Sequence, residues 1–114
     1  MLIPGPAKKI TIHLNADTSS RTTFLSREIL LLLFERGVAG ASVVRPEAGF
    51  GSHHKIHSPG RGIDASSHLP LRVEFMDTAE RVDALLPELR ELVTDGVIES
   101  QDTVILKAVA EKDR

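Results

Sequence analysis

The chain of 114 residues contains no cysteine, tyrosine or tryptophan. The lack of cysteine excludes disulfides, thiolate metal ligands and a cysteine nucleophile, and it is consistent with a cytoplasmic protein. The longest apolar run, residues 29–34, has six residues, whereas a membrane-spanning helix needs about 20. The N-terminal residues lack the apolar core of a signal peptide. We therefore expect a cytoplasmic protein.

No stretch of the sequence is strongly charged with one sign. The 14 basic and 16 acidic residues give a formal net charge of −2. Because no basic stripe is present, we expect no nucleic acid among its partners. The motifs G-x-S-x-G and H-E-x-x-H and the phosphate-binding P-loop are also missing. We therefore predict no enzymatic activity and no catalytic residues.

The sequence contains a repeated order of strand, helix, glycine and strand. Its length is sufficient for a single domain, whose core is expected over about residues 8–107. The first half predicts a strand at 8–14, a helix at 23–36 and a strand at 41–45; the second half predicts a strand at 69–76, a helix from 77 and a strand near 103–107. Two such halves predict a ferredoxin-like βαββαβ fold of the α+β class. Both helices would cover one face of a four-stranded antiparallel sheet.

The predicted helix ends rest on capping residues. Gly37 and Gly96 each follow a helix, where a glycine adopts the left-handed conformation at little cost. Asp77 with Glu80 three residues later is typical of a helix N-terminus, with Asp77 as the capping residue. Pro87 lies inside the second helix, and we expect it to bend that helix.

Two surfaces of the predicted fold are candidates for contact with other molecules. The open face of the sheet would carry Thr11, His13, Arg72 and Glu74, a mixed polar surface. The four leucines at 30–33 wrap most of the circumference of the first helix, so part of this apolar run faces away from the sheet. Burial between subunits and exposure on a surface helix both explain these leucines.

A long loop at residues 47–67 separates the two halves and reads EAGFGSHHKIHSPGRGIDASS. Loops longer than about 12–15 residues are uncommon in a compact domain and are usually functional or disordered. Three histidines lie in it, His53, His54 and His57, together with four glycines. We therefore place the function of the chain at this loop.

The order and spacing of several short segments resemble those of a known family. The segments are Val-Ala-Gly-Ala-Ser-Val at 38–43, Gly-Phe-Gly at 49–51, Leu-Pro-Leu at 69–71 and Asp-Gly-Val-Ile at 95–98. Over about residues 8–106 the chain resembles the PII-like family catalogued as domain of unknown function 190, and more distantly the PII nitrogen-signalling proteins. The resemblance implies a homotrimer that binds a small ligand, an adenine nucleotide or similar metabolite, in clefts between subunits. It also implies a partner protein docked on the long loop, the T-loop, and suggests a membrane transporter or channel as that partner.

The resemblance assigns residues to these roles. The ligand site is expected at the base of the loop and in the turn after the second helix: Gly49, Phe50, Gly51, Ser52, Thr94, Asp95 and Gly96. The partner-binding part of the loop would contain His53, His54, Lys55, His57 and Arg61. Unlike PII proteins, this chain has an acidic, lysine-free segment at 95–102, which predicts a less charged ligand than ATP. Because the chain has no tyrosine, uridylylation of a T-loop tyrosine is excluded.

The residues themselves leave other interpretations of the loop open. The Gly-Phe-Gly segment also suits a tight turn in which Phe50 packs against the core. His53 and His57 are candidate ligands for zinc or copper in a metal-sensing protein, and they also suit a solvated loop. A constitutive interaction module without a ligand is the third alternative.

Overall fold

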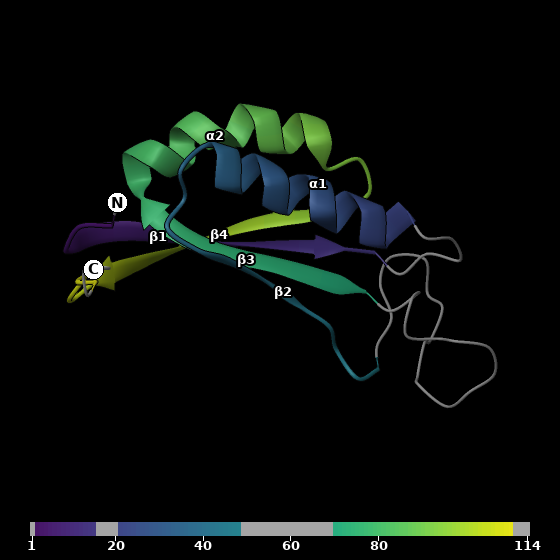
Figure 1. The fold of residues 1–114 in the computed structure, drawn as a ribbon, viewed down its shortest axis with the longest axis horizontal. Coiled ribbons are helices and arrows are strands. Elements are labelled where there is room, and N and C mark those ends of the chain that lie inside the picture. The colour runs from purple at the N-terminus through teal and green to yellow at the C-terminus, as the bar shows by residue number, and fades with distance from the viewer. Residues whose placement is uncertain (1, 16–20, 49–69, 111–114) are drawn as a thin grey trace, which may run out of the picture.

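The computed structural model describes residues 2–15, 21–48 and 70–110 (Figure 1). Its elements follow the order β1 (Gly5–Leu14), α1 (Arg21–Glu35), β2 (Ala41–Val44), β3 (Leu71–Thr78), α2 (Ala79–Leu92) and β4 (Gly96–Ile105). Over the described part of the chain, no helix is both long and apolar enough to span a bilayer. The βαββαβ order confirms the predicted ferredoxin-like fold.

The four strands form one sheet in the order β2-β3-β1-β4, and every neighbouring pair is antiparallel. The central strand β1 pairs with β3 on one side and β4 on the other, so that Ile12 lies opposite both Val73 and Ile98. Both helices lie on the same face of the sheet (Figure 1). Among the described residues no helix covers the other face, in agreement with the prediction.

The core lies between the sheet and the two helices. Every second residue of β3, and of β1 from Ile10 to Leu14, points into it, which confirms the predicted alternation. The residues of the buried cluster are Ile10, Ile12, Leu14, Ile29, Leu33, Leu71, Val73, Phe75, Val82, Leu85 and Leu89. The core therefore joins the two central strands to one side of each helix.

The first helix ends at a left-handed glycine. Gly37 has φ 76°, and its N–H donates to the Phe34 carbonyl at 3.1 Å. The N–H of Val38 donates to the Leu33 carbonyl at 3.0 Å, which completes a Schellman motif. The predicted role of Gly37 is confirmed.

The predicted role of Gly96 is wrong. Helix α2 ends at Leu92 with Val93 as its C-cap, and Gly96 is the first residue of β4. A Cβ at position 96 would overlap the carbonyl oxygen of His13 on the neighbouring strand. Glycine is required here because the two backbones approach closely, not because a helix ends.

The start of α2 also differs from the prediction. Thr78, not Asp77, is the N-cap, since the Thr78 side chain accepts a hydrogen bond from the N–H of Arg81 at 3.4 Å. Asp77 is 1% exposed, and its carboxylate accepts from the Thr78 N–H at 2.8 Å and from Arg81 Nε at 3.0 Å. Arg81 Nη2 also donates to the carbonyl of Arg36 at 2.6 Å. Arg81 thus joins the end of β3 to the C-terminus of α1.

Replacement of Arg81 by methionine should destabilise the fold, because Asp77 would remain buried with one hydrogen bond fewer. An unsatisfied buried polar group costs about 1–3 kcal/mol, and more when it is charged. The free energy of unfolding from urea denaturation measures this loss. Arg90→Met, an exposed arginine of the same helix, is the matched control and should change the stability far less. Equal losses in the two variants would show that the contact between Arg81 and Asp77 is unimportant.

Candidate functional site

The candidate residues that the structure describes lie at one end of the sheet. Leu14, the last residue of β1, lies opposite both Leu71 at the start of β3 and Gly96 at the start of β4. The strand β2 ends at this same end, since Val44 lies opposite Arg72. Thr94, Asp95 and Gly96 therefore share an end of the molecule with residues 48 and 70, from which the long loop departs (Figure 1).

At this end of the sheet, the turn formed by residues 94–96 and the base of the loop, which follows β2, lie at opposite edges. The strand order puts β3 and β1 between β2 and β4. Neighbouring strands are about 4.8 Å apart, so the end of β2 and the start of β4 are separated by roughly 14 Å. A small ligand that contacts both positions needs either loop residues that cross the sheet end or a second subunit.

The turn between α2 and β4 is tied to the end of β1. Thr94, Asp95 and Gly96 are exposed. Asn15 Nδ2 donates a hydrogen bond to Asp95 Oδ1 at 2.6 Å. The interaction orients the Asp95 carboxylate at the sheet end. Asn15 was not predicted as a site residue, because only the strand pairing brings positions 15 and 95 together.

A second polar pair lies on the open face of the sheet next to this turn. His13 Nε2 and Glu99 Oε1 are 2.6 Å apart, with side chains 43% and 58% exposed. On β3, Arg72 Nε lies 3.7 Å from Glu74 Oε2. These residues confirm the predicted polar face with one exception. Thr11 is only 9% exposed, because it lies between Glu74 and Glu99 on the two neighbouring strands.

Most of the acidic segment at 95–102 belongs to a strand, not to the turn after the second helix with which the family resemblance compares it. Residues from Gly96 onward belong to β4, which starts seven residues earlier than predicted. Asp102 therefore lies about 23 Å beyond Asp95 along an extended strand, and Glu99 is engaged by His13. The three carboxylates do not converge on one ligand position. Of these three acidic residues, only Asp95 lies at the candidate site.

The remaining predicted residues lie outside the described residues: Gly49, Phe50, Gly51, Ser52, His53, His54, Lys55, His57 and Arg61. Their roles in ligand and partner binding stay predictions. The same holds for a zinc or copper site formed by His53 and His57. Within the described ranges, no three histidine, aspartate or glutamate side chains gather as metal ligands do.

Comparison with known proteins gives a family and several similar folds. The model of the DUF190 family, described as uncharacterized, matches residues 7–105. The fold is similar to CPII, a nitrogen regulatory PII-like protein from Thiomonas intermedia K12 bound to ADP, AMP and bicarbonate, with a TM-score of 0.65, 20% identity and 94% of each chain covered. It is also similar to the PII-like signaling protein TTHA0516 from Thermus thermophilus, with a TM-score of 0.63, 16% identity and coverage of 93% and 94%.

A more distant similarity is to CutA1 from Oryza sativa, with a TM-score of 0.52, 12% identity and coverage of 93% of this chain and 85% of that one. At these identities the three solved structures show a shared fold.

Gly96→Ala should loosen the end of the sheet that carries the candidate site, because the added methyl group overlaps the His13 carbonyl. Overpacking of this kind costs about 1–3 kcal/mol, which a thermal denaturation midpoint reports. Gly40→Ala is the matched control, since a Cβ at position 40 meets nothing within 4 Å. A midpoint for Gly96→Ala equal to that of the control would contradict the close approach of β1 and β4.

Proposed function

This chain belongs to the DUF190 family, and we propose that it is a PII-like regulatory protein that binds an adenine nucleotide as a homotrimer. The observation that carries the proposal is the position of Thr94, Asp95 and Gly96 at the sheet end from which the long loop departs. Support also comes from the fold shared with CPII, whose structure contains ADP, AMP and bicarbonate.

The nucleotide site is completed by a second subunit. In one chain the turn at 94–96 and the base of the loop are separated by two strands, a gap of roughly 14 Å. The turn of one subunit and residues Gly49, Phe50, Gly51 and Ser52 of its neighbour together form the cleft. Phe50 stacks on the base, and the glycines let backbone N–H groups approach the phosphates.

The long edge strand β4 supports assembly into an oligomer. Only Ile105 of its ten residues is buried within the subunit. Val97 and Val104 are 53% and 61% exposed. A long exposed edge strand with apolar side chains is a liability that proteins usually cover. Neighbouring subunits cover β4 in the proposed trimer.

The long loop transmits the state of the ligand site to a partner protein. Its His53, His54, Lys55, His57 and Arg61 form the contact surface, and a membrane transporter or channel on the cytoplasmic side is the partner that the family resemblance suggests. A ligand shifts the loop only if it binds two loop states with different affinities. The protein acts by binding and has no catalytic step.

The charge at Asp95 selects among nucleotides. A single carboxylate beside the phosphate groups disfavours each added negative charge, and AMP or ADP is therefore preferred over ATP. Because Glu99 and Asp102 lie elsewhere on β4, the discrimination depends on one residue.

Isothermal titration of the protein with AMP, ADP and ATP tests the proposed function. Binding of AMP or ADP is the expected result, with weaker binding of ATP. Asp95→Asn removes the charge while keeping an oxygen for the bond to Asn15, and it should strengthen ATP binding by roughly 3- to 10-fold.

Asp102→Asn, an exposed carboxylate farther along β4, is the control and should leave all three affinities unchanged. If none of the nucleotides binds, the proposed function is wrong. If Asp95→Asn and its control behave alike, Asp95 does not lie beside the phosphates.

A further inference from the structure

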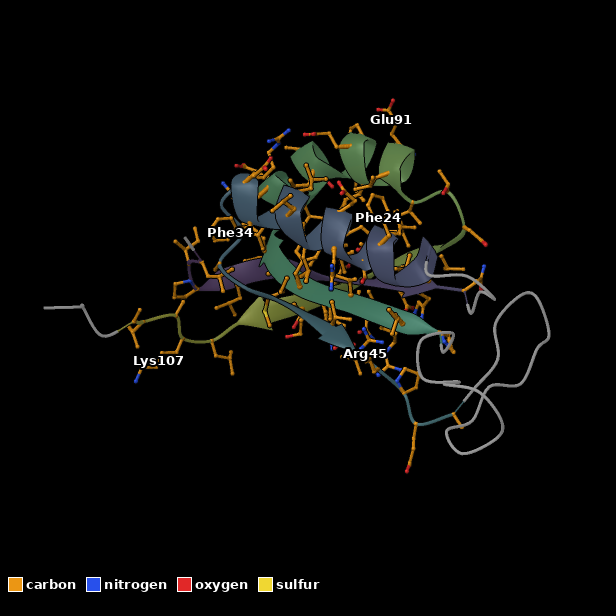
Figure 2. All side chains as sticks on the ribbon, turned by 45° about the vertical axis from the view of Figure 1, so that its right-hand side comes forward. Phe24, Phe34, Arg45, Glu91 and Lys107 are labelled. Carbon is orange, nitrogen blue, oxygen red and sulfur yellow. The ribbon has the colours of Figure 1, made fainter. Side chains whose placement is uncertain are left out.

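A groove between the two helices has apolar and acidic walls. Its lining residues are Glu28, Leu31, Leu32, Glu35, Glu88, Glu91 and Leu92. The groove has a volume of about 360 Å³ and lies on the helical layer. Its residue Leu92 is the last residue of α2, two residues before Thr94 of the candidate ligand site. Figure 2 shows Glu91 on α2 pointing away from the sheet.

Of the three leucines that line the groove, Leu32 and Leu92 pack against the core, whereas Leu31 is not part of it. Ile29 and Leu33 of α1 are 0% and 1% exposed, whereas Leu31 is 54% exposed. Phe24, seven residues before Leu31 on the same side of α1, is 63% exposed (Figure 2). The leucine run therefore divides into a buried part and a part that faces outward, beside the groove.

The charges of the groove have a single sign. All four of its ionisable lining residues are glutamates. Arg36 binds Glu88 in a bidentate pair, with Nε to Oε1 at 2.9 Å and Nη2 to Oε2 at 2.6 Å. The hydrogen bond from Arg36 lowers the pKa of Glu88, and this carboxylate stays ionised at neutral pH.

Glu28 and Glu91 make no ion pair with any residue that the structure describes. The arginines next to them in sequence, Arg27 and Arg90, point to other sides of their helices, because adjacent helical residues do not face each other. The rim thus carries excess negative charge around an apolar floor, which is complementary to a cationic amphipathic segment.

We propose that this groove binds a basic amphipathic helix of a partner protein. The apolar side of that helix packs on Leu31, Leu32 and Leu92, and its lysines or arginines pair with Glu28 and Glu91. This is the helix-in-groove mode of recognition. A second copy of this chain is a poor occupant, since a symmetric contact would bring two sets of glutamates together. The groove shares no residue with the proposed nucleotide cleft, although Leu92 lies two residues before Thr94.

The probe is a fluorescein-labelled helical peptide of about 14 residues, with leucines on one side and lysines on the other. Fluorescence anisotropy with the full chain should show saturable binding that weakens as sodium chloride is raised. A peptide of the same composition in scrambled order, without an apolar side, should bind at least about tenfold more weakly.

Charge-matched variants locate the binding site. The double variant Glu28→Gln/Glu91→Gln should weaken peptide binding about tenfold. Glu80→Gln/Asp102→Asn changes the net charge equally at exposed positions away from the groove and should leave the affinity unchanged. Leu31→Ser, at an exposed position, should also weaken binding without lowering the melting temperature.

Three outcomes would overturn the proposal. These are a failure of the amphipathic peptide to bind, equally tight binding of the scrambled peptide, and an equal loss of affinity in the two charge-matched variants. A further contrary result is self-association: if Glu28→Gln/Glu91→Gln increases the molar mass measured by light scattering, the groove is a contact between copies of this chain.

Discussion

The antiparallel pairing of β1 with strands on both sides is the constraint on which the structure depends. Because Leu14 lies opposite both Leu71 and Gly96, one strand aligns the start of β3 and the start of β4 at the same sheet end. The close contact at Gly96 requires a residue without a side chain. A slip of one residue in either pairing would turn the apolar residues of β1 to the open face and would separate Asn15 from Asp95.

Most of the fold could be predicted from the sequence, because the alternation of β1 and β3 and the spacing of the helices are strong signals. The start of β4 was missed for a physical reason. Its residues are exposed on both sides along much of its length, so that no alternation of apolar and polar residues marks it. Asp77 was misplaced because a capping pattern does not show that the preceding strand turns position 77 into the core.

The candidate sites were less predictable. Thr94, Asp95 and Gly96 are candidates through the family resemblance alone, while the bond between Asn15 and Asp95 depends on a strand pairing of residues 80 positions apart. The groove between the helices was not predicted either. Glu28 and Glu91 belong to different helices, and only the packing of α1 beside α2 brings them to one groove. The two surfaces together suit the regulatory role proposed above, in which one region binds a ligand and another contacts a protein.

The central claim is that two subunits share each nucleotide site, and native mass spectrometry of the wild-type protein with ADP tests it most directly. The account predicts an assembly of three 12.4 kDa chains that carries up to three nucleotides, and no nucleotide on the dissociated single chain. A monomer that binds ADP by itself, or a trimer that binds none, would contradict it.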